Sequence, residues 1–212
     1  MAASTRTPAS AIASTDTSTG AAPGRAQRSD ARQNVTALIA AAKSVFAESG
    51  VEAPVRAIAE RAGVGVGTLY RHFPLRSDLI SAVFRAEIDA CAAAATEIEA
   101  ASPPGEALDR WIMRYTQFVG TKRGLAAALH SGDPAYEPLA DYFSTHLAPT
   151  LERLLASARS AGDIEQEVDA VELLGAVANL CHGAGPHGGV SPRADRMVRI
   201  LLAGLRAPAD EL

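Results

Sequence analysis

The feature that most constrains this chain is a pair of short helical segments that meet at a glycine and end at a proline. The first, over residues 55–62, carries a short apolar face around Ile58 at helical spacing. Gly63 follows as the residue that most readily takes the left-handed conformation at a helix end. The second segment, Val66–His72, is stopped by Pro74. Two helices about a glycine-containing turn predict a helix-turn-helix.

The string GVGVGTLYRHFP, residues 63–74, resembles the end of the DNA-binding domain of TetR-family transcriptional regulators. LRSDLI, which follows directly, looks like the start of that family's fourth helix. The resemblance extends over roughly residues 32–85. It departs from the family at Gly65, where many members carry Ser, and at Ala53-Pro54, where a Thr or Ser cap is common. The resemblance implies that the second short helix enters the major groove of double-stranded DNA.

The resemblance also assigns roles to individual side chains. Tyr70 and His72 would donate hydrogen bonds to phosphates, and Arg76 would add a charge-assisted phosphate contact from the fourth helix. Gly67 would admit close approach to the bases, where Thr68 offers a hydroxyl and a methyl group. Two alternatives stay open: Tyr70 only packs across the helix pair, and Arg71 is a solvated charge. The residues assigned to DNA in this way are Arg56, Val66, Gly67, Thr68, Tyr70, Arg71, His72 and Arg76.

The charge of the chain is divided unevenly. Its 212 residues have a net charge of −4, but residues 1–85 hold ten Lys/Arg against six Asp/Glu, and residues 86–212 hold ten against eighteen. A basic end beside an acidic remainder fits one domain that faces nucleic acid and one that faces protein. The sequence has no apolar run long enough for a membrane span and no secretory pattern in its first thirty residues, so we expect a cytoplasmic protein.

Only helical patterns follow the helix-turn-helix, which predicts an all-α fold of about nine helices. We expect the first helix to begin near Arg32, the fourth to begin at Arg76 or Ser77 with Ser77 as a candidate cap, and a later helix over residues 136–161 to kink at Pro149. The expected parts are a disordered tail over 1–30, a helix-turn-helix DNA-binding domain over 31–78, a helical effector-binding and dimerisation domain over 79–206, and a flexible end over 207–212.

The last two helices are unusually apolar. One starts at an Asp169-x-x-Glu172 capping pattern, and the other starts at Ser191-Pro192 and turns Met197 inward with its leucines. In the TetR family two such helices from each subunit form a dimer interface, so the resemblance implies a homodimer. An internal core that needs no partner is the alternative.

Aromatic residues gather on the helices that surround a ligand cavity in this family. Each ring alone can be core instead, but together they favour a small apolar or aromatic effector. Thr121–Leu129, TKRGLAAAL, also looks like one recurrent TetR subclass. The candidate ligand residues are Trp111, Tyr115, Phe118, Leu125, Leu129, His130, Tyr142, Phe143 and His146.

The competing classes are an enzyme, a metalloprotein and a DNA-binding protein without an effector. The sequence has no HExxH, no C-x-x-C and no G-x-S-x-G, and it has no strand pattern to host a phosphate loop. We therefore expect no enzyme activity and no cofactor. Cys181 and His182 with His187 form the one candidate metal cluster, although loop and core histidines are commoner. Cys91 and Cys181 are expected to be buried free thiols.

Overall fold

The computed structural model describes residues 1, 23–120, 134–181 and 190–208, with side chains in the first helix described from residue 30 onward. Within these ranges the secondary structure is entirely helical, which confirms the all-α prediction. The short helix expected over 121–130 lies outside the described residues. The elements are α1 (Pro23–Ser49), α2 (Val55–Ala62), α3 (Val66–His72), α4 (Arg76–Ala101), α5 (Pro104–Gly120), the 3-10 turn η1 (Pro134–Tyr136), α7 (Glu137–Ser160), α8 (Ala170–Cys181) and α9 (Pro192–Gly204).

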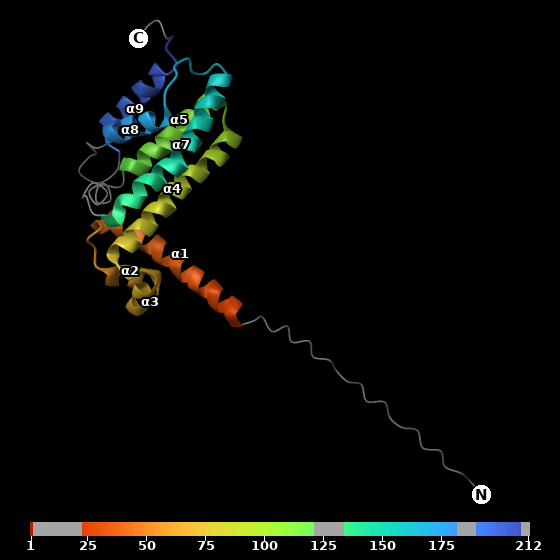
Figure 1. Cartoon of the computed structure of the whole chain (residues 1–212), viewed down its shortest axis with the longest axis vertical. Helices are drawn as coiled ribbons and strands as arrows, with labels where there is room; N and C mark the ends of the chain where they lie inside the picture. Colours follow the sequence, from red (N-terminus) through yellow and green to blue (C-terminus); the bar gives the residue numbers. More distant parts are fainter. Residues whose placement is uncertain (2–22, 121–133, 182–189, 209–212) are drawn as a thin grey trace.

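Helices α1, α2 and α3 form one end of the molecule, which we call the head (Figure 1). Its core is built around Leu38 and Val45 of α1, Ile58 of α2 and Leu69 of α3, all nearly inaccessible to solvent. The prediction that α1 begins near residue 32 was wrong, because the helix begins at Pro23. Proline is favoured at the first helical position and the following residues include several good helix formers.

Helix α4 connects the head to the rest of the fold. Leu79 and Val83 pack into the head core, whereas Ile80, Phe84 and Ile88 belong to the second, larger core. Its predicted start at Arg76 is confirmed, but the predicted cap at Ser77 is wrong. Leu75 precedes the helix, and the Leu75 N–H donates to Oδ2 of Asp78 at 2.9 Å. The acid at the third helical position therefore reaches back to the N–H of the residue that precedes the helix, which is one half of a capping box.

The larger part, which we call the body, consists of α5 and α7, which pack along α4, and of α8 and α9, which pack on α5 and α7 (Figure 1). The start of α5 is fixed by Asp163, whose Oδ2 accepts the Gly105 N–H at 2.7 Å. Helix α7 continues through Pro149 as one helix, and a kink there stays a prediction. None of the helices in the described ranges is both long and apolar enough to cross a membrane.

The predicted starts of the last two helices are confirmed. Asp169 Oδ1 accepts the N–H groups of Val171 and Glu172 at 2.8 and 2.9 Å, and Ser191 Oγ accepts the Ala194 N–H at 3.1 Å. The inward placement of Met197 was wrong, since this side chain is 38% exposed. The buried positions of α9 recur every four residues, at Ala194, Val198 and Leu202, which leaves Met197 on the outer face.

Candidate nucleic-acid interface

The turn between α2 and α3 is made by backbone geometry. Gly63 has φ 69°, in the left-handed region, and the Val64 N–H donates to the Ala59 carbonyl at 3.0 Å. Gly65 then precedes α3 in an extended conformation, and its carbonyl accepts the N–H of Thr68 at 2.9 Å. Glycine offers no side-chain cap here, so the start of α3 depends on these backbone bonds. The predicted boundaries of both helices are confirmed.

Helix α3 has one buried side chain and a mostly exposed outer surface. Leu69 is 1% exposed and anchors the helix in the head core. Tyr70 is 49% exposed, and Gly67 and Arg71 are also exposed. The side chains of Val66, Thr68 and His72 are partly exposed. No acidic residue lies in α3, so its outer surface carries no charge that would repel phosphate.

Gly67 leaves open space on this surface. A Cβ added at Gly67 would meet no heavy atom within 4 Å, and its backbone is not in the left-handed region. The fold therefore does not require glycine at this position. The lack of a side chain would let another molecule approach the helix backbone closely. This is the role that the resemblance assigned to Gly67.

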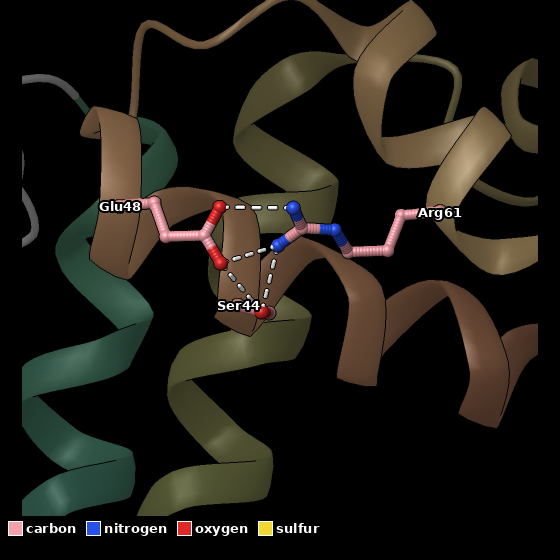
Figure 2. A network of polar contacts seen from close by, with 3 residues as sticks. All are labelled: Ser44, Glu48 and Arg61. Carbon is pink, nitrogen blue, oxygen red and sulfur yellow. Dashed lines mark hydrogen bonds and ion pairs between the residues drawn. The ribbon is translucent and has the colours of Figure 1, made fainter.

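A polar network that the sequence analysis did not identify holds α2 against α1 (Figure 2). Arg61 donates to both carboxylate oxygens of Glu48, at 2.6 and 2.9 Å, and to Ser44 Oγ at 2.8 Å. The hydrogen bonds from Arg61 hold the pKa of Glu48 below its usual value, and those to Glu48 raise the pKa of Arg61. Residues 13 positions apart in sequence meet here, so no local spacing pattern could have shown it.

Two arginines assigned to DNA make contacts within the head. Arg56 forms an exposed ion pair with Glu60, one turn further along α2, at 2.9 Å. Arg76 is partly buried at the start of α4, and its Nε donates to the Val51 carbonyl at 2.9 Å. Its Nη2 also donates to the carbonyls of Val51 and Ala53. The Arg76 guanidinium therefore lies on the loop between α1 and α2.

The candidate effector residues on α5 lie in the core of the body. Trp111 and Tyr115 have no exposed surface, and Phe118 is 4% exposed. Trp111 Nε1 donates to the Cys91 carbonyl at 2.9 Å, and the Tyr115 hydroxyl donates to the Leu174 carbonyl at 3.1 Å. Burial raises the pKa of the Tyr115 hydroxyl. The polar groups of both rings are thus satisfied by protein backbone, as buried donors require.

The candidates on α7 lie nearer the surface. Tyr142, Phe143 and His146 are partly exposed. The Tyr142 hydroxyl donates to Asp89 Oδ1 on α4 at 2.6 Å, and its ring stacks on His146 with centroids 3.8 Å apart. Phe143 contacts the buried rings through Tyr115, at a centroid separation of 6.0 Å. The remaining candidates, Leu125, Leu129 and His130, lie outside the described residues.

A surface pocket of about 410 Å³ lies away from these aromatic residues. It is lined by Glu152, Leu155 and Arg159 of α7 and by residues 167–170 before and at the start of α8. None of the candidate effector residues that the structure describes lines it. In the part of the chain that the structure describes, no three His, Cys, Asp or Glu side chains are grouped to hold a metal ion. Cys91 and Cys181 are both buried thiols that form no disulfide, as expected, and His182 and His187 fall in an undescribed range.

Together the head and body define a two-domain helix-turn-helix DNA-binding protein. Residues 38–83 match the family model for "bacterial regulatory proteins, tetR family", and residues 103–207 match that for the "transcriptional regulator SbtR-like, C-terminal domain". The chain belongs to the TetR family of DNA-binding transcriptional regulators, and not to an enzyme family.

Known relatives agree with this assignment. The TetR transcriptional regulator SCO0520 of Streptomyces coelicolor is 33% identical, with a TM-score of 0.66 over 82% of this chain and 99% of that one. A TetR regulator of Mycobacterium vanbaalenii is 31% identical, with the same TM-score over 85% and 99%. An HTH-type transcriptional regulator of Staphylococcus aureus is 41% identical over 63 residues, 29% of this chain. That match spans only about a third of the length of the curated relative.

Proposed function

We propose that this protein is a repressor that binds a near-palindromic DNA operator as a homodimer and is released by a small apolar or aromatic ligand. The observation that carries the proposal is the outer surface of α3. It presents Tyr70, Gly67 and Arg71 to solvent, lacks acidic residues and is anchored from behind by Leu69. In this proposal α3 reads base edges through Gly67 and Thr68, while Tyr70 and His72 bind phosphates. Since its site of action is DNA, we expect the protein in the cytoplasm.

The proposed dimer interface is the outer face of α8 and α9. Val171, Met197 and Ile200 are 51%, 38% and 57% exposed there. The other strongly exposed large apolar side chains among the described residues are Met1, Tyr70 and Leu75. A concentration of apolar surface on two neighbouring helices supports an interface. A two-fold dimer would place two α3 helices on two half-sites, which is why the operator is expected to be near-palindromic.

Introducing one charged side chain into the proposed interface tests this dimer. We expect Ile200→Glu to shift the protein towards monomer, with at least about a tenfold weaker dimer, because the interface would bury an unpaired carboxylate. Sedimentation velocity over a range of concentrations measures the effect. Leu75→Glu adds the same charge at an equally exposed apolar position on the head and should leave the mass unchanged. A wild-type monomer at micromolar concentration, or an Ile200→Glu dimer as tight as the wild type, would contradict this interface.

The proposed effector site lies where the aromatic residues of α5 and α7 meet. Tyr142, Phe143 and His146 are the partly exposed rings there, whereas Phe118 is 4% exposed and Trp111 and Tyr115 are fully buried with their polar groups occupied. A ligand that prefers the conformation with separated heads would lower DNA affinity through that difference in binding alone. The same buried polar contacts favour the second candidate, a DNA-binding protein without an effector.

Selection of bound sequences from a random duplex library would test the central claim. The expected product is one near-palindromic motif whose half-sites are centred about one helical turn, or a multiple of it, apart. Failure to enrich any motif, together with no binding to duplexes at low ionic strength, would overturn the proposal. Addition of aromatic compounds to the selected complex then separates the two candidates, because only an effector-responsive protein dissociates.

A further inference from the structure

Arg76 occupies an unusual place for a cation. It is the first residue of α4, where the helix dipole favours negative charge and disfavours a guanidinium. Its side chain turns back to the loop between α1 and α2 and donates to the carbonyls of Val51 and Ala53. These carbonyls are 25 and 23 residues away in sequence. The unfavourable position is therefore offset by contacts with another part of the head.

The loop offers carbonyls that a guanidinium fits well. Gly50 has φ 79° and ends α1, and Ala53, 4% exposed, directly precedes Pro54 and the start of α2. Carbonyls just outside helices lack helical partners and need other donors. Arginine presents several N–H groups in a rigid planar fork, whereas a lysine ammonium is a single point on a flexible chain. Two carbonyls on one side chain thus favour arginine specifically.

We propose that Arg76 is a positioning residue for DNA reading and makes no phosphate contact. By tying the first turn of α4 to the residues directly before α2, it sets the orientation of α2, and through Gly63 that of α3, relative to α4. This inference rests on the proposed function, because the orientation matters only if α3 reads DNA. It replaces the phosphate role that the family resemblance assigned to Arg76.

Arg71 provides the matched comparison. It lies five residues earlier, is exposed on α3 and has no ion pair among the described residues. A phosphate contact contributes charge, so its loss lowers the salt dependence of DNA affinity by roughly 0.9 in the log–log slope. A positioning contact contributes geometry, so its loss lowers affinity and leaves the slope nearly unchanged. The two roles therefore give different results in one assay.

The experiment measures affinity for the selected operator at several salt concentrations with full-length wild type, Arg76→Lys, Arg76→Gln and Arg71→Gln. We expect Arg76→Lys, which keeps the charge, to bind about tenfold more weakly. Arg76→Gln should lose at least as much affinity with nearly the wild-type slope, whereas Arg71→Gln should lower the slope. Arg76→Lys binding as tightly as the wild type would overturn the inference. If Arg76→Gln lowered the log–log slope by roughly 0.9, the value for one lost phosphate contact, this would also overturn the inference.

A second measurement needs no variant. In the DNA-free wild type, the Arg76 Nε–H should exchange slowly with solvent, because it is already bonded to Val51, and its resonance should not shift further when operator is added. Fast exchange without DNA and protection only with DNA would overturn the inference even if the variants do not fold. Failure of the wild type to bind any duplex would instead refute the proposed function, with the Nε–H protection unaffected.

Discussion

The head and the body hold their helices together in different ways. Among the described residues, the head core comprises eleven buried residues, of which four are alanines and one, Phe73, is aromatic; the partly buried Phe46 packs against them. The body core is more than twice as large and contains Trp111, Tyr115, Phe118 and Phe84, each within about 6 Å of another ring. Large rings bury more apolar area per residue than alanine does. The head therefore has less apolar burial with which to fix the angles between its helices.

The polar contacts of the head and the body also differ in how far they are shielded from solvent. In the body, the donors of Trp111 and Tyr115 are satisfied out of reach of solvent. In the described part of the head, Arg61 joins α2 to α1, Arg76 joins α4 to the α1–α2 loop, and Lys43 joins α1 to Glu87 of α4, all at least partly at the surface. Surface contacts are individually weak and respond to salt and pH. The body also has surface contacts between helices, such as Tyr142 with Asp89 and Arg153 with Glu99, so its distinguishing feature is the additional set of buried polar contacts.

The largest expected effect tests the body. Trp111→Ala should lower the free energy of unfolding by about 3–5 kcal/mol, because it removes a fully buried ring together with its Nε1 hydrogen bond to the Cys91 carbonyl. Urea unfolding at fixed protein concentration measures this. Tyr142→Phe is the control, since it removes one hydroxyl from a partly exposed ring and should cost about 1 kcal/mol or less. Equal losses in the two variants would contradict the distinction between core and surface aromatics.

An intermediate effect tests the head. Gly67→Ala should raise the free energy of unfolding by up to about 1 kcal/mol, because alanine favours helix and the added methyl meets no other atom. The same methyl should weaken binding to the selected operator if α3 approaches the bases closely at this point. Binding to random duplex at low salt is the control and should change less, because it depends mainly on charge. Unchanged operator affinity would remove Gly67 from the proposed contact surface.

What the sequence predicted correctly depends on neighbouring residues. The bounds of α2 and α3 follow from a glycine, a proline and a short apolar face, and the cap at Ser191 follows from the residues beside it. Residues far apart in sequence make the contacts that hold the head together, such as Arg61 with Glu48 and Arg76 with Val51. Those contacts depend on how the helices pack, and one chain's local pattern does not contain that information.

The outer face of α9 also shows what local sequence patterns fail to predict. Helical spacing correctly predicts that Ala194, Val198 and Leu202 share a buried face, but it does not predict how wide that face is. Met197 lies beyond its edge because nothing in the described fold covers it. The DNA and effector assignments likewise came from the family resemblance, and they stay predictions until the partners are tested.

The smallest expected effect concerns the Glu48–Arg61 contact and has a defined sign with pH. Arg61 lowers the pKa of Glu48 below its ordinary value of 4.5, so folding favours the carboxylate. The stabilisation is therefore complete above pH 4.5 and is lost as the pH falls through the lower pKa of the folded state. The free energy of unfolding should fall more steeply below pH 4.5 in the wild type than in Glu48→Gln. Urea unfolding at a series of pH values between 6 and about 3 measures this.

Glu60 supplies the matched control, because its ion pair with Arg56 lies within α2 and links no second helix. Glu60→Gln should follow the wild-type pH profile more closely than Glu48→Gln does. The difference is expected to be small, since both partners of the Glu48 pair are about half exposed and solvent screens them. Parallel profiles for the wild type and Glu48→Gln would show that this contact adds no stability. In that case the small apolar core and the Arg76 contacts become the main described interactions that hold α2 and α3 in place.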